Sequence, residues 1–99
     1  MYARVTTLEA PPDRMDEATH HVRDQALPQL QQQVGFKRLI ALGDRQSAKV
    51  LGIALWGSEE ALRATEEMAS RLRGGMLEAP GAAAAGAENY EVAIFELSS

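Results

Sequence analysis

Cysteine is absent from the chain, which excludes disulfides, thiolate catalysis and cysteine-based metal sites. Basic residues are few: ten Lys and Arg are scattered along the sequence, and the net charge is -4. Nonspecific binding to nucleic acid rests on clustered Lys and Arg, so we expect no nucleic-acid partner. No apolar run approaches the roughly 20 residues that cross a bilayer, so we expect no membrane partner. The N-terminal stretch "MYARVTTLE" lacks the profile of a signal peptide, and we therefore expect a cytoplasmic protein.

The remaining composition is that of an ordinary globular protein. Of the 99 residues, 45% are hydrophobic and 24% are charged. A chain of this length buries only about 65% of the surface that it exposes when unfolded, so its core is thin. We expect one domain over residues 1–99.

Hydrophobic periodicity and turn residues divide the chain into six regular segments. Ser58 is placed to cap the second helix, and Gly74–Gly75 to end it. Pro28 interrupts the first helix, where we expect a kink or a break before a short piece that ends at Gln33. The predicted strands cover 2–9, 36–43, 50–56 and 89–97, and the predicted helices cover 13–33 and 58–72.

This order, β-α-β-β-α-β, is typical of a ferredoxin-like α+β sandwich. It predicts a four-stranded antiparallel sheet with both helices on one face and with the first and third strands in the centre. Residues 76–88, which include "PGAAAAGA", show the least periodicity. Over residues 73–88 we expect a loop or a short extra helix that acts as a flap over the mouth of a cavity.

Side chains alternate across a strand, so each strand divides into two sets. We expect the more aliphatic set to lie under the helices: Val5, Leu39, Ala41, Leu51, Ile53, Leu55, Ala93, Phe95 and Leu97. The other set would form the opposite, open face: Tyr2, Arg4, Thr6, Leu8, Phe36, Arg38, Ile40, Leu42, Val50, Ala54, Trp56, Tyr90, Val92 and Ile94. This second set is too apolar to remain in water. It predicts a ligand pocket or a homodimer interface, and the two are compatible.

The stretch "LPQLQQQVGFKRLIALGDRQSAKVLGIALWGSEEAL" (residues 27–62) resembles the antibiotic-biosynthesis-monooxygenase-like family of the dimeric α/β-barrel superfamily. The features that carry the resemblance are Pro28, Gly35–Phe36, Trp56 and the Ser-capped segment 58–62. The resemblance implies a homodimer that packs through the open sheet faces, with a cavity in each protomer. Family members include cofactor-free oxygenases of polycyclic phenols, quinol monooxygenases and haem-degrading enzymes, so the fold does not settle the function.

The resemblance implies either of two functions for this chain. One is a cofactor-independent monooxygenase that acts on quinol or phenolic compounds; the other is a non-catalytic binding or structural dimer with the same fold. The haem-degrading branch uses a His in the second helix and an Asn in the first strand. Here residues 58–72 contain no His, and Arg4 and Thr6 occupy the first strand, so haem degradation is disfavoured.

Cofactor-free oxygenation requires groups that stabilise a phenolate-like anion and stack on its ring. Arg4 and Arg38, together with Thr6, are the expected donors, and Trp56 and Tyr90 are the expected aromatic walls. His21 is the candidate general base, with Arg38 as the second candidate for a catalytic role.

Each of these residues has a structural alternative. The arginines can pair with a carboxylate such as Glu96, and Trp56 can anchor a dimer interface. Tyr90 can be an ordinary tyrosine near the sheet edge. His20, with acidic residues four positions away on both sides, reads as a solvated helix face, and we expect no metal site.

Overall fold

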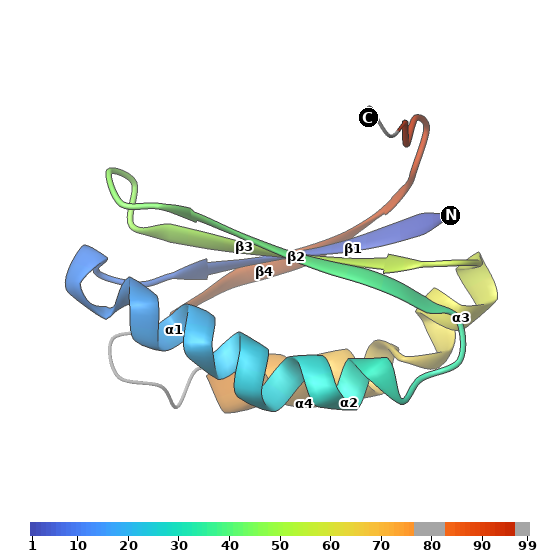
Figure 1. The fold of residues 1–99 in the computed structure, drawn as a ribbon, viewed down its shortest axis with the longest axis horizontal. Helices are drawn as coiled ribbons and strands as arrows, with labels where there is room; N and C mark the ends of the chain where they lie inside the picture. Colours follow the sequence, from blue (N-terminus) through green and yellow to red (C-terminus); the bar gives the residue numbers. More distant parts are fainter. Residues whose placement is uncertain (77–82, 97–99) are drawn as a thin grey trace.

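The computed structural model describes residues 1–76 and 83–96. Its strands form one sheet in the order β2-β3-β1-β4, and every neighbouring pair is antiparallel (Figure 1). Strands β1 and β3 are therefore central, as predicted. The strands are β1 (Tyr2–Glu9), β2 (Phe36–Asp44), β3 (Lys49–Trp56) and β4 (Ala83–Glu91).

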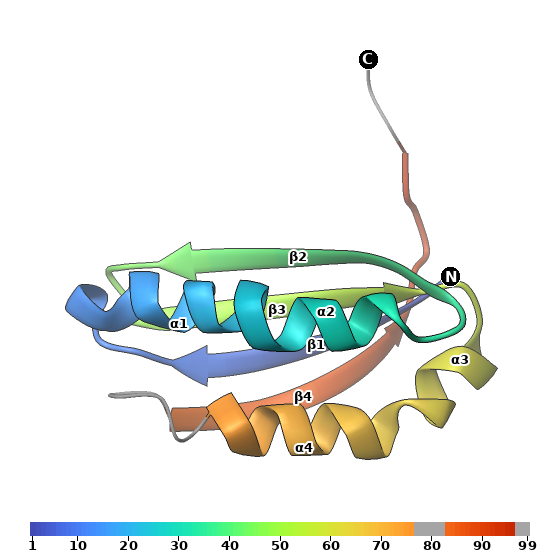
Figure 2. The same ribbon diagram turned by 60° about the horizontal axis from the view of Figure 1, so that its bottom comes forward.

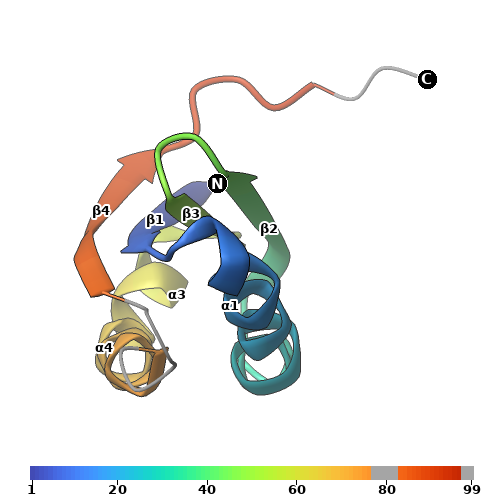
Figure 3. The same cartoon turned by 90° about the vertical axis from the view of Figure 1, so that its left-hand side faces the viewer.

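Two lines of helix lie side by side on one face of the sheet, and the other face is left open by them (Figures 2 and 3). This arrangement confirms the ferredoxin-like α+β fold. No helix in the described part of the chain is both long and apolar enough to cross a membrane. The first line contains η1 (Pro12–Arg14), α1 (Met15–His21), the π-helical η2 (Val22–Ala26) and α2 (Leu27–Gln31); the second contains α3 (Glu59–Ala64) and α4 (Glu66–Met76).

The first helical line passes Pro28 through a widened turn rather than a break. The N–H of Leu27 bonds to the carbonyl of Val22, five residues earlier, which is the π-helical pattern. Pro28 then lies in the first turn of α2, where a missing N–H costs least. The helix ends at Gln31, two residues before the predicted end.

The second helical line is capped as predicted but is broken in the middle. The Ser58 hydroxyl accepts a hydrogen bond from the N–H of Ala61 at 3.1 Å, which confirms the N-cap. Thr65, with φ -105° and ψ 10°, separates α3 from α4, a break that the sequence pattern did not reveal. The prediction that Gly74–Gly75 ends the helix is wrong, since α4 continues to Met76.

Strand β4 begins earlier than predicted. The prediction placed it at 89–97, whereas it runs from Ala83 to Glu91 and pairs with β1 over its whole length. Ladder pairing to β1 overrides the weak strand preference of the alanines. Of the predicted flap at 73–88, residues 73–76 are helical and 83–88 belong to β4, while 77–82 lie outside the described residues.

The two faces of the sheet were assigned wrongly for β1 and β3. Leu8, Val50 and Trp56, which we expected on the open face, are only 2%, 1% and 0% exposed and pack beneath the helices. Both sets of β3 side chains are apolar, so alternation separated the sets without showing which one the helices cover. Tyr2, Arg4, Thr6 and Ala54 likewise belong to the helix side.

A bulge in strand β2 changes which of its side chains face the helices. Its register shifts between Phe36 and Arg38, so Phe36 packs beneath the helices whereas Arg38 is paired with Leu55 of the open face. Leu39 is on the helix side as predicted, and Ile40 and Leu42 are on the open side as predicted.

Candidate functional site

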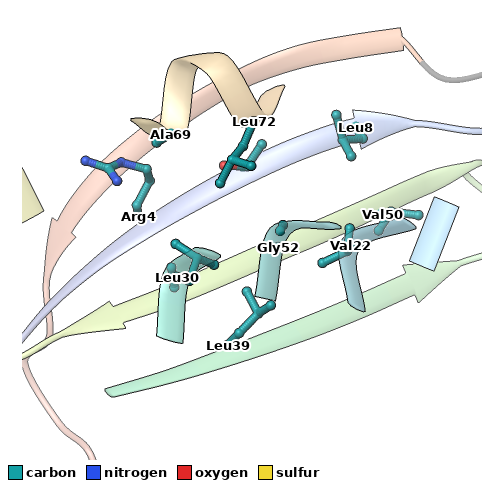
Figure 4. Close-up of a pocket in the computed structure, with 12 residues that line it drawn as sticks. Arg4, Leu8, Val22, Leu30, Leu39, Val50, Gly52, Ala69 and Leu72 are labelled. Atoms are coloured by element: carbon teal, nitrogen blue, oxygen red, sulfur yellow. The ribbon is translucent and has the colours of Figure 1, made fainter. Parts of the chain in front are cut away.

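A small pocket lies between the sheet and the two helical lines. Its volume is about 60 Å³, and its lining residues come from strands β1, β2 and β3 and from both helical lines (Figure 4). Arg4 and Leu8, both on β1, lie toward its opposite ends (Figure 4). The lining residues are Arg4, Thr6, Leu8, Val22, Ala26, Leu30, Leu39, Val50, Gly52, Ala54, Ala69 and Leu72.

The lining is aliphatic except for Arg4 and the half-buried Thr6. An apolar pocket with a few polar groups is the usual form of a small-molecule site. Arg4 supplies the only charged group among the described residues that line the pocket. The pocket therefore suits an apolar ligand with one acidic or hydrogen-bond-accepting group.

The Arg4 guanidinium is held at the break between α3 and α4. Arg4 is 4% exposed, and its Nη2 donates to the carbonyl oxygen of Leu62 at 2.6 Å. Its Nη1 donates to Oγ1 of Thr65 at 3.4 Å. A cation at this position also meets the negative end of the α3 dipole. Arg4 thus lines the pocket, and its guanidinium caps α3.

Sequence reasoning missed the two residues that hold Arg4. Leu62 acts through its backbone carbonyl, which no sequence pattern reports. Thr65 carried a weak signal, because a Thr in the middle of a helix can bond its own backbone and bend the helix.

Trp56 is a core residue of the monomer. The side chain is fully buried and meets the Phe36 ring edge-on, with centroids 5.6 Å apart and an interplanar angle of 70°. It also packs with Leu30, Ala54 and Leu62. Its indole N–H finds no acceptor among the described residues. The expectation that Trp56 looks away from the helices is wrong, because β3 turns its other face outward.

Arg38 and Tyr90 lie on the opposite side of the sheet from Arg4 and Thr6. The Arg38 guanidinium carbon is 6.0 Å from the centroid of the Phe95 ring. Tyr90 is 50% exposed and donates its phenolic proton to the Glu88 carboxylate, which raises the pKa of Tyr90. The five residues expected to share one cavity are therefore divided between two faces.

His21 is half-buried near the end of α1 and is not among the residues that line the pocket. No His, Asp or Glu of the described residues lines it. Within the same residues, no group of three or more His, Cys, Asp or Glu side chains is arranged to hold a metal ion.

A second, more polar groove of about 420 Å³ lies where α3 meets the outer strand β4. Arg63 forms an ion pair with Glu59 one turn earlier along α3. The groove borders the pocket region at Leu62, which is among its lining residues and whose carbonyl accepts from Arg4. It is lined by Tyr2, Glu59, Leu62, Arg63, Glu66, Asn89, Tyr90 and Glu91.

Sequence comparison relates the chain to proteins without an assigned activity. The uncharacterised protein Rv2558 of Mycobacterium tuberculosis is 40% identical over 73 residues, which are 74% of this chain and 31% of that protein. The uncharacterised protein Rv2557 of the same organism is 34% identical over 93 residues, 94% of this chain and 41% of that protein. The chain thus spans less than half the length of these relatives. No family model matches the sequence.

Solved structures share the fold. A monooxygenase from the gene ActVA-Orf6 of Streptomyces coelicolor, solved with the ligand nanaomycin D, superposes with a TM-score of 0.77 at 18% identity, covering 99% of this chain and 92% of that one. The heme-degrader MhuD of Mycobacterium tuberculosis, solved with two hemes in its active site, gives 0.74 at 19% identity, covering 97% and 99%. A putative antibiotic biosynthesis monooxygenase from Deinococcus radiodurans matches over the full chain with a TM-score of 0.68. This chain therefore has the antibiotic-biosynthesis-monooxygenase fold, as its Gly35–Phe36 and Trp56 features led us to expect.

Proposed function

We propose that this domain binds a small aromatic compound with an acidic hydroxyl group in the pocket between sheet and helices, and oxidises it with O₂ without a cofactor. The observation that carries the proposal is the buried Arg4 in an otherwise aliphatic lining. A guanidinium stays charged at every physiological pH, so it stabilises the ligand's oxyanion over the neutral hydroxyl. Monooxygenase neighbours with the same fold add support.

The reaction needs no group beyond the ligand and O₂. For a CH₂ group activated by flanking aromatic rings, the balance is R₂CH₂ + O₂ → R₂C=O + H₂O. The ligand reacts as its hydroxyl tautomer, in which one hydrogen of the CH₂ group has moved to a conjugated oxygen. This hydroxyl loses its proton to solvent, and the resulting anion, delocalised onto the former CH₂ carbon, passes one electron to O₂. The two radicals combine and take up a proton to give a hydroperoxide, which loses water as its O–O bond breaks. Arg4 would stabilise the first anion, and the aliphatic lining would exclude water.

Binding requires the helical lines to move apart. An apolar cavity of about 150 Å³ holds benzene, whereas this pocket measures about 60 Å³. Val22, Ala26 and Leu30 come from the first helical line, and Ala69 and Leu72 from the second. Separation of the two lines would enlarge the pocket without disturbing the sheet.

A second function, non-catalytic binding by the same fold, is favoured by one observation. Among the described residues, the pocket lining contains no His, Asp or Glu that would accept the ligand's proton. In this case the protein would carry or sequester the aromatic compound. Arg4 would have the same role in recognition.

The experiment is oxygen uptake and ligand binding with a panel of hydroquinones and anthrones. We expect uptake by the wild type and its loss in Arg4→Met, while Arg38→Ala, the matched arginine change on the open face, retains it. Arg4-dependent binding without oxygen uptake would establish the second function. If no compound of the panel binds, both proposed functions are refuted.

The open sheet face supports the homodimer that the resemblance implies. Ile40 and Leu42 on β2 are 38% and 47% exposed and lie beside Ile53 and Leu51 of β3. Together with the exposed Phe95, they form an apolar surface of the kind that a second copy covers. Its outer strands carry charges of opposite sign, Arg38 on β2 and Glu88 on β4, which a two-fold axis can pair across the interface. The cytoplasmic location stays a prediction that cell fractionation tests.

A further inference from the structure

We propose that the break between α3 and α4 positions the charged group of the pocket, and that Thr65 is the positioning residue. In this arrangement Thr65 determines how strongly the pocket prefers an anionic ligand over its neutral form. The inference rests on the proposed function, in which the acidic oxygen of the ligand meets Arg4.

The Thr65 side chain makes the break. Its hydroxyl lies 3.1 Å from the carbonyl oxygens of both Ala61 and Leu62, to which it can donate. A hydroxyl that bonds the backbone one turn earlier competes with the helical pattern and bends the helix. The Thr65 N–H turns to the Leu62 carbonyl at 3.3 Å, a tighter turn than an α-helix allows, and a new helix begins at Glu66.

The break brings the Leu62 carbonyl within reach of the sheet. In an uninterrupted α-helix this carbonyl points along the axis toward the N–H of Glu66. Here it accepts a 2.6 Å hydrogen bond from Arg4 of β1. Thr65 itself accepts from the same guanidinium, so both ends of the guanidinium fork meet the break.

The same break also aligns the pocket walls. Arg4 is paired with Ala54 in the sheet, and both line the pocket. Ala69 and Leu72 of α4 line it from the other side, and α4 takes its direction from Thr65, whose carbonyl accepts the N–H of Ala69 at 2.9 Å. A guanidinium fixed in this way needs little reorganisation when an anion arrives. If Thr65 lost its hydroxyl, the guanidinium would lose the Thr65 acceptor, and the Leu62 carbonyl would shift.

The test uses 4-nitrophenol, whose absorbance distinguishes phenol from phenolate when it is bound. Its pKa in the complex is measured with the wild type, Thr65→Ser, Thr65→Val and Arg4→Met. We expect the wild type to lower the pKa of the bound phenol and Thr65→Ser to do the same. Thr65→Val, which keeps the shape without the hydroxyl, should bind the phenol but lose about tenfold of the preference for phenolate, equivalent to one pKa unit. Arg4→Met should abolish the preference.

The outcomes separate the two proposals. A wild-type shift that Thr65→Val leaves intact would overturn the positioning role and leave the proposed function standing. A wild type that does not bind 4-nitrophenol, or a shift that survives Arg4→Met, would overturn both. If Thr65→Val does not fold, as judged by circular dichroism, Thr65→Ala and Arg4→Lys are measured instead. Both should lower the preference, the first by removing the hydroxyl and the second by replacing the fork with a single ammonium.

Discussion

The rings of Phe36 and Trp56 meet edge to face beneath the helices, with ring centroids 5.6 Å apart. The two residues are partners in the β2–β3 ladder, where the bulge that follows Phe36 turns the next residues of β2 outward. This pair closes one end of the core between the sheet and both helical lines. Trp56 therefore stabilises the protomer itself.

Truncation of Trp56 should consequently be costly. We expect Trp56→Ala to lower the free energy of unfolding by about 3–5 kcal/mol, as for a large aromatic residue removed from a core. Trp56→Phe should cost less and leave the dimer dissociation constant unchanged. Urea denaturation monitored by circular dichroism measures the first effect, and light scattering on dilution measures the second. A loss below 1 kcal/mol for the alanine variant would contradict the core position.

A charge on the open face should dissociate the proposed dimer. Leu42→Asp places a carboxylate in the centre of the apolar surface, where burial without a partner is unfavourable. We expect a monomer mass by size-exclusion chromatography with light scattering at micromolar concentration. Val34→Asp is the matched control, because Val34 is 91% exposed in the turn before β2. A dimer that survives Leu42→Asp, or a wild-type monomer, would refute this interface.

Gly35 should tolerate no side chain. Its φ is +86°, in the left-handed region, and an added Cβ would lie 2.5 Å from the Cβ of Ala61. The backbone strain alone costs about 1–2 kcal/mol, so we expect Gly35→Ala to destabilise the fold by at least this amount. Gly74→Ala in α4, where nothing lies within 4 Å, should instead stabilise it by about 0.5–1 kcal/mol. Chemical denaturation of both variants provides the comparison, and equal effects would contradict it.

The hairpin between β2 and β3 contains a carboxylate with a lowered pKa. The Ser47 hydroxyl and then the Gln46 N–H donate to Asp44 and hold the pKa of Asp44 below its ordinary value. Because the folded-state pKa is depressed, the stabilisation is present above the unfolded pKa and is lost as pH falls through the folded value. We expect Ser47→Ala to raise the pKa of Asp44, measured by an NMR titration of its carboxyl carbon. An unchanged titration midpoint would show that the hydroxyl contributes nothing.

The sequence predicted the fold well because the relevant signals are local. Ser58 capped the helix it was expected to cap. The element order was compatible with few topologies, and the structure has the ferredoxin-like one among them. The residue pattern that resembled the monooxygenase family also indicated the correct fold.

The candidate site was predicted less well, because its geometry depends on packing. Arg4 and Thr6 were recognised as candidate ligand-binding residues, and the structure places both in one pocket. Arg38 and Tyr90 were expected beside them but lie across the sheet, since the bulge in β2 and the earlier start of β4 decide where they point. Those features arise from the pairing of neighbouring strands, which the alternation of residues within one strand does not predict.

Strand periodicity, caps and turn residues thus determined the order and type of the elements, because each depends on neighbours within a few residues. Only the tertiary structure decided which side of β1 and β3 the helices cover, since both sides of β3 are apolar and burial is settled by what packs on them. It also decided that Arg4 meets Thr65. That contact joins residues far apart in sequence and exists because a helix that could have been continuous is broken above the strand.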